Sequence, residues 1–149
     1  MTQFVARLLF FMLFSVASAA RPAHVGVDAP WKIVNFWSIT CAPCRIEIPE
    51  LNALNEELAG SGVAVVGVNF DDDPRAQTMA LAKRMGIRFP TLTASEVNLL
   101  KLEPPNALPT TYILSADNTV RAKLIGPQSR ETINQKLLEL GINRGKVHE

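Results

Sequence analysis

Apolar residues occur along the chain in two patterns, continuous runs and single residues three or four positions apart. The run 32–37 is short and apolar, as expected for a strand buried on both faces of a sheet, and the run 63–70 has the same character. Between them an amphipathic helix is predicted, ending at Gly60 and Gly62, by the apolar positions Ile48, Leu51, Leu54 and Leu58. Strand, helix and strand therefore predict one crossover unit with two parallel strands.

Residues 71–73, all aspartates, precede Pro74 and a helix that is predicted to end at Gly86. An aspartate N-cap followed by proline in the first helical position is typical of a helix start. The alternative for this acidic run is a metal site, although the oxygen-ligand loop pattern of calcium sites is absent.

The second half of the chain predicts further strands and helices. A short strand is predicted over 89–93, and Ser95 is expected to cap a helix that extends through Leu102. Two β-rich runs, 110–114 and 120–125, are separated by turn-forming residues and predict an antiparallel hairpin. A last helix is expected over about 129–140, so the chain has the element order of an α/β fold with a mixed sheet.

The first twenty residues have the order of a secretory signal peptide. Arg7 precedes the apolar run 8–14, and small residues follow at 17–20. The apolar stretch of about 13 residues is shorter than the ~20 of a membrane-spanning helix, so cleavage is favoured over a retained anchor. A mature domain over 21–142, a polar tail over 143–149 and a periplasmic location are the corresponding expectations.

Length and charge narrow the class of protein. A chain of 149 residues usually builds one domain. Its net charge of +1 and the lack of a lysine- and arginine-rich face give no reason to expect a nucleic-acid partner. We expect a monomer.

Cys41-Ala-Pro-Cys44 is the feature with the clearest chemistry, since it lies between a buried strand and the start of a helix. Free backbone N–H groups and the helix dipole stabilise a thiolate there, which makes Cys41 the expected nucleophile. Free cysteine ionises near pH 8.5, whereas such pairs have pKa values of roughly 3.5 to 7. Cys41 would attack a substrate disulfide, and Cys44 would then displace the substrate.

Two other interpretations of the pair remain open at this point, half of a zinc site and an inert disulfide. Zinc prefers four ligands, and the only histidines, His24 and His148, lie near the chain ends. No metal and no cofactor other than a redox-active Cys41–Cys44 disulfide are expected.

The segments 34–51, 65–72 and 108–114 together resemble TlpA-like thioredoxins, and most closely the cytochrome c maturation reductases. The likeness covers about 32–126. It implies a thioredoxin fold, a mixed central sheet flanked by helices, with an inserted strand and helix over 87–105.

The resemblance also implies a substrate groove. Pro109 matches the family's cis-proline, which leaves the backbone of Leu108 free to pair with a substrate strand. Pro43, inside the cysteine motif, is assigned to the same groove. Thr40 replaces the tryptophan that usually precedes the first cysteine, so the docking surface differs from that of the family.

Glu47 is a candidate acid–base residue by the same resemblance, one turn beyond Cys44. The alternative is an exposed glutamate that only favours the helix dipole. Asn35 occupies a strand position where many thioredoxins carry a buried aspartate, so Glu47 is the carboxylate left to assist Cys44.

The sequence thus predicts an enzyme, an exported thiol-disulfide oxidoreductase that reduces periplasmic protein substrates. The resemblance implies that a membrane thiol carrier supplies its electrons. Two alternatives on the same fold are a copper-binding or copper-delivery module, because thiolates suit Cu(I), and a non-catalytic binding scaffold.

Overall fold

The computed structural model describes residues 26–142. The predicted signal peptide, the C-terminal tail and both histidines lie outside the described residues. The elements, in chain order, are β1 (Trp31–Trp37), α1 (Ala42–Glu57), β2 (Val63–Asn69), α2 (Arg75–Met85), α3 (Ala94–Leu100), β3 (Thr110–Leu114), β4 (Val120–Ile125) and α4 (Arg130–Glu139).

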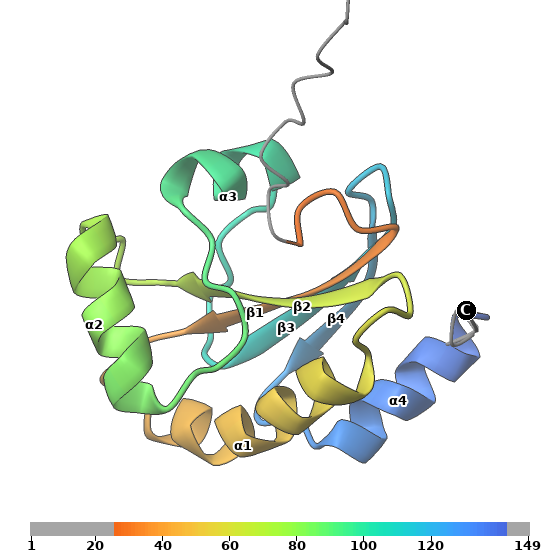
Figure 1. Ribbon diagram of the computed structural model, residues 1–149, viewed down its shortest axis with the longest axis horizontal. Coiled ribbons are helices and arrows are strands. Elements are labelled where there is room, and N and C mark those ends of the chain that lie inside the picture. Colours follow the sequence, from red (N-terminus) through yellow and green to blue (C-terminus); the bar gives the residue numbers. More distant parts are fainter. Residues whose placement is uncertain (1–25, 143–149) are drawn as a thin grey trace, which may run out of the picture.

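The four strands form one mixed sheet in the order β2-β1-β3-β4 (Figure 1). β1 is parallel to β2 and antiparallel to β3, so Ile33 lies between Val65 and Ile113. β3 and β4 form the predicted antiparallel hairpin. Because β1 is an inner strand, the residues that follow it lie near the middle of one end of the sheet.

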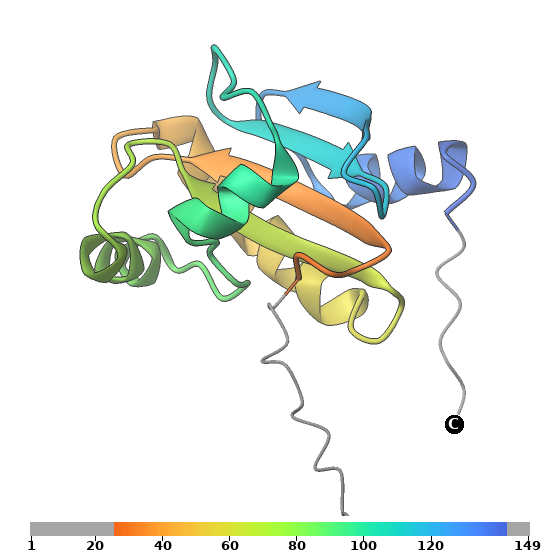
Figure 2. The ribbon, with the colours of Figure 1, turned by 90° about the horizontal axis from the view of Figure 1, so that it is seen from above.

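Helices cover both faces of the sheet (Figures 1 and 2). Successive side chains of a strand point to opposite faces, and β1 shows this clearly. Ile33 packs with apolar residues of α1 and α4, whereas Val34 and Phe36 belong to the cluster on the α3 side. A strand buried on both faces explains why β1 is apolar at nearly every position.

α2 lies at the end of the sheet where β1 and β2 finish (Figure 1). Its residues Leu81 and Met85 pack against Trp37, at the end of β1, and against Ile48 of α1. The α2 helix therefore supports the segment that carries the cysteines. Within the described part of the chain, no helix is long and apolar enough to cross a membrane.

The start of α2 differs from the sequence prediction. Pro74 is the N-cap and makes no side-chain capping bond, so the predicted aspartate cap is wrong. The carboxylate of Asp73 instead accepts hydrogen bonds from the side chains of Asn69 and Gln77. Gly86 ends α2 in the left-handed conformation, as predicted.

The segment after α2 also differs. Residues 89–93 form a single parallel bridge, Gly67 to Thr91, instead of a strand. A Cβ on Gly67 would lie only 3.0 Å from the Phe89 ring, so the segment can approach β2 closely because residue 67 is glycine. Thr93, not Ser95, caps α3, and it forms a capping box with Glu96.

Candidate active site

The two cysteines lie at the start of α1 and form a disulfide. Cys41 is the N-cap residue in an extended conformation, and its Sγ accepts a hydrogen bond from the backbone N–H of Cys44, with N···S 3.2 Å. Pro43 lies in the first turn, where no backbone donor is needed. The first turn of α1 thus directs an N–H group at the Cys41 sulfur, as the sequence predicts.

The two sulfurs differ in exposure. Cys44 is fully buried and packs with Trp37 and Ile48, whereas Cys41 is half-buried at the edge of the same cluster. A substrate disulfide can therefore approach Cys41 from outside, while only Cys41 is within reach of Cys44. Cys41 is therefore the more accessible member of the pair.

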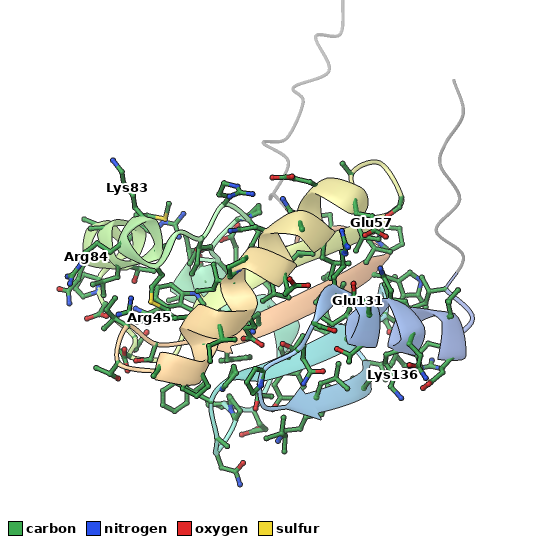
Figure 3. All side chains as sticks on the ribbon, turned by 90° about the horizontal axis from the view of Figure 1, so that it is seen from below. Arg45, Glu57, Lys83, Arg84, Glu131 and Lys136 are labelled. Carbon is green, nitrogen blue, oxygen red and sulfur yellow. A yellow bond between two sulfur atoms is a disulfide. The ribbon has the colours of Figure 1, made fainter. Side chains whose placement is uncertain are left out.

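The loop that joins β1 to the cysteines is held by side-chain hydrogen bonds. The hydroxyl of Ser38 donates to Asp71, with O···O 2.6 Å, and also accepts from the backbone N–H of Thr40. The guanidinium of Arg45 donates to the carbonyl of Ile39 at 2.8 Å, and Figure 3 shows Arg45 near the start of α1. The role of Asp71 was not foreseen, because nothing in the sequence connects it with Ser38.

The Leu108–Pro109 peptide bond is cis, as the resemblance implies. Phe36 of β1 pairs with Thr110 of β3, so this bond lies beside the end of β1 that leads to the cysteines. The Leu108 side chain packs against the same cluster as Cys41. Within residues 26–142, the Leu108 backbone forms no hydrogen bond, so its N–H and C=O are unpaired there.

Glu47 is buried, with 1% of its surface exposed, so the alternative of an exposed first-turn glutamate is wrong. It lies one turn after the buried Cys44 on the inner face of α1. Its Oε1 accepts from the Asn35 side chain at 2.6 Å, and its Oε2 accepts from the backbone N–H of Gln128 at 3.0 Å. The helix therefore places a buried carboxyl group one turn after Cys44, tied to β1 and to the loop before α4.

Burial is the main influence on the Glu47 carboxyl, because it penalises the charged form. The hydrogen bonds from Gln128 and Asn35 act in the opposite direction, and the net result raises the pKa of Glu47 from 4.5 to about 7. A group with such a pKa exchanges its proton readily at neutral pH. Glu47 therefore has the environment of an acid–base residue.

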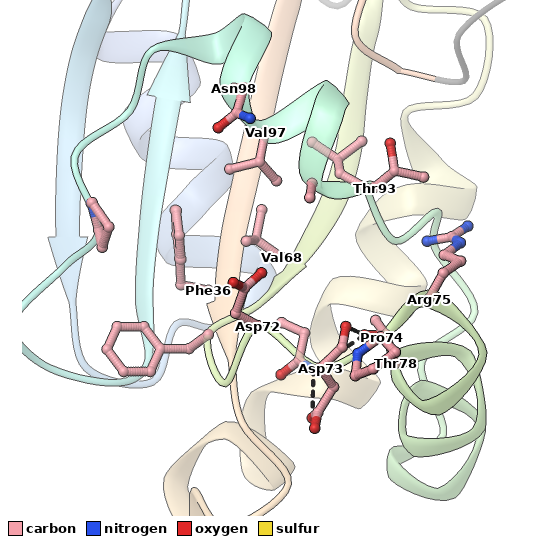
Figure 4. Close-up of a pocket in the computed structure, with 15 residues that line it drawn as sticks. Phe36, Val68, Asp72, Asp73, Pro74, Arg75, Thr78, Thr93, Val97 and Asn98 are labelled. Atoms are coloured by element: carbon pink, nitrogen blue, oxygen red, sulfur yellow. Dashed lines mark hydrogen bonds between the residues drawn. The ribbon is translucent and has the colours of Figure 1, made fainter.

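A pocket of about 550 Å³ opens on the α3 side of the sheet (Figure 4). Its wall includes the apolar side chains of Phe36, Val68 and Val97, and Asp72 and Arg75 also line it. Neither cysteine contributes to this pocket. Among residues 26–142, no three His, Cys, Asp or Glu side chains are grouped closely enough to hold a metal ion.

Comparison with known proteins identifies relatives. Residues 25–123 match the AhpC/TSA family. The thiol:disulfide interchange protein HelX of Rhodobacter capsulatus is 30% identical over 132 residues, which cover 81% of this chain and 72% of HelX. The thiol-disulfide oxidoreductase ResA of Geobacillus thermodenitrificans is 30% identical over 104 residues, and the match spans 70% of this chain but only 59% of ResA.

The chain is also similar to solved structures. A secreted thiol-disulfide isomerase of Corynebacterium glutamicum is 27% identical and superposes with a TM-score of 0.60 over 76% of this chain and 71% of its own. StoA of Bacillus subtilis, at 24% identity and a TM-score of 0.59, supports the fold. The chain therefore belongs to the AhpC/TSA family, as a TlpA-like, thioredoxin-fold thiol-disulfide oxidoreductase with a Cys41–Cys44 redox pair.

Proposed function

We propose that the protein is an exported reductase that transfers two electrons from the Cys41–Cys44 dithiol to disulfides of protein substrates during cytochrome c maturation. The observation that carries this proposal is the asymmetry of the pair, with Cys41 partly exposed at the helix N-cap and Cys44 buried one turn before the buried Glu47. The cytochrome c role and the reducing direction are supported by the sequence resemblance, and export by the signal-like first twenty residues.

The reaction consists of two exchanges. The Cys41 thiolate attacks one sulfur of the substrate disulfide, so that a mixed disulfide forms and the other substrate sulfur leaves as a thiolate. Cys44 then loses its proton to Glu47 and attacks Cys41 Sγ. The Cys41–Cys44 disulfide forms and the second substrate sulfur is released. A membrane thiol carrier returns the two electrons.

Glu47 suits this proton transfer for two reasons. It lies on the same buried face of α1 as Cys44, one turn away. Its pKa of about 7 means that its charged and neutral forms are both populated near neutral pH, so it can accept the Cys44 proton and later lose it.

The substrate is expected to bind as an extended segment beside Pro109. The unpaired backbone of Leu108 offers one donor and one acceptor to such a segment, as in other cases where a peptide adds to an open edge. Pro43 is exposed next to Cys41 and completes the groove on the other side of the disulfide. A protein substrate fits this open surface.

The reduction potential tests the direction of electron flow. Trp37 packs with Cys44, so its fluorescence is expected to report the state of the pair during titration with a thiol–disulfide buffer. We expect a potential more negative than about −180 mV, on the reducing side of protein disulfide isomerase.

Trp37→Phe is the matched control, because it should remove the fluorescence change and leave Trp31 at the other end of β1. A potential near −120 mV, the value of a strong oxidant, would show that the protein oxidises its substrates instead.

A further inference from the structure

The side-chain amide of Asn35 lies between Glu47 and Thr111 and is fully buried. Its Nδ2 donates one hydrogen to Glu47 Oε1, at 2.6 Å, and the other to Thr111 Oγ1, at 3.0 Å. Its Oδ1 is also buried, yet it has no hydrogen-bond partner among residues 26–142. Both donors of the amide are used, while its only acceptor atom, Oδ1, is left unsatisfied.

This arrangement suits the ionised form of Glu47. Both carboxylate oxygens then act as acceptors, Oε1 from Asn35 and Oε2 from the backbone N–H of Gln128. The two donors differ in kind. The Gln128 N–H belongs to the main chain and can only donate. The side-chain amide of Asn35 can turn either its donor nitrogen or its acceptor oxygen toward Glu47.

Protonation of Glu47 makes this difference decisive. Oε2 accepts from the Gln128 N–H, so the proton is best placed on Oε1, the oxygen that faces Asn35. The O–H group would then face the N–H group of Asn35 at 2.6 Å, donor against donor. Rotation of the amide by about half a turn removes the conflict, because Oδ1 then takes the place of Nδ2 and can accept from both the Glu47 and the Thr111 hydroxyls.

We propose that Asn35 is a positioning residue whose amide reverses each time Glu47 gains or loses a proton, so that the buried carboxyl is hydrogen-bonded in both states. In the reducing cycle, Glu47 takes the Cys44 proton as the S–H bond breaks and the O–H bond forms on Oε1, and Asn35 turns from donor to acceptor. This inference rests on the proposed role of Glu47 and adds the group that makes its proton transfer reversible.

Among residues 26–142, Asn35 is the one side chain that forms a hydrogen bond with the Glu47 carboxyl. The causes that set its pKa are burial, the Gln128 N–H and Asn35, and no charged group is among them. Thr111, from β3, contacts the amide of Asn35, and Cys44, from α1, is the proton donor in the cycle. An aspartate at position 35 would instead place two carboxyl groups together, which would have to share one proton.

The test is an NMR titration of the oxidised protein, in which the cysteines do not titrate. The side-chain amide of Asn35 is assigned through its contacts with Thr111, and its nitrogen and proton shifts are followed between pH 5 and pH 9 together with the Glu47 carboxyl carbon. We expect the Asn35 signals to change with the same midpoint as Glu47, near pH 7, and the contact between the amide protons and Thr111 to disappear at low pH.

Glu47→Gln provides a second and independent readout. Gln128 requires the glutamine oxygen, so the glutamine N–H₂ group must face Asn35 and hold its amide reversed at every pH. The Asn35 signals of this variant should match those of the wild type at low pH and stay constant. Glu50→Gln, one turn on, should titrate as the wild type does.

Asn35 signals that remain constant in the wild type while Glu47 titrates would overturn the inference, and so would Glu47→Gln signals that match the high-pH form. Neither outcome bears on the proposed function, because disulfide reduction is measured separately and depends on the cysteines.

Discussion

Replacement of Cys41 by serine is expected to lower the rate of protein disulfide reduction by on the order of 10³-fold or more, the scale on which loss of a catalytic nucleophile acts. Cys41 is the half-exposed sulfur at the N-cap, and Cys44 is fully buried and cannot take its place. A serine hydroxyl does not form disulfides, so no mixed disulfide can arise. The rate is measured with reduced protein and a disulfide-bonded protein substrate.

Cys44→Ser is the matched control, since it removes one sulfur from the same turn of α1 and leaves the nucleophile in place. It should lose turnover but accumulate a mixed disulfide between Cys41 and the substrate, visible by non-reducing electrophoresis. Cys41→Ser should accumulate none. Reduction by Cys41→Ser at the wild-type rate would rule out the exchange mechanism through Cys41.

Glu47→Gln is expected to change how stability depends on pH. The folded-state pKa of about 7 lies above the ordinary value of 4.5, so the folded state favours the neutral carboxyl and ionisation favours unfolding. The contribution of Glu47 is therefore fully present below about pH 4.5 and is lost as the pH rises through about 7. The difference between these values, at about 1.4 kcal/mol for each pH unit, corresponds to a loss of about 3 kcal/mol.

Denaturant unfolding of the oxidised protein at pH 5 and pH 8 checks this prediction, because the cysteines do not titrate in the disulfide. Between pH 5 and pH 8 the free energy of unfolding of the wild type should fall more than that of Glu47→Gln does, by most of this loss of about 3 kcal/mol. The variant has no ionisable group at position 47. Glu56→Gln serves as the control, since Glu56 lies on the same helix but is exposed. Equal pH dependence in the wild type and Glu47→Gln would show that Glu47 is not held neutral by burial.

Much of the fold follows from the spacing of apolar residues. The runs that become β1 and β2 are apolar because helices cover both faces of the sheet, and the hairpin β3–β4 is marked by its turn residues. The cap of α3 could have been found, because Thr93 and Glu96 have the spacing of a capping box. The aspartate cap predicted for α2 failed because Asp73 has partners elsewhere.

The cysteines could be placed from sequence because strand, motif and helix are adjacent in the chain. The burial of Glu47 was also readable, since it continues the inward-facing stripe of Cys44, Ile48 and Leu51 along α1. Its partners were not, because Asn35 and Gln128 are 12 and 81 residues away and meet it only when β1, α1 and the loop before α4 have packed. Periodicity reports which face is buried and not which polar groups meet there.

The N-terminus of α1 is expected to make Cys41 the reactive thiolate of the pair. The most direct test of this expectation is to treat the reduced wild-type protein with less than one equivalent of iodoacetamide at a series of pH values and to locate the label by mass spectrometry. We predict that nearly all label is on Cys41. Its rate of modification should rise at a pH well below about 8.5, the pKa of a free cysteine thiol. Equal labelling of Cys44, or a rate that rises only near that ordinary value, would contradict the account.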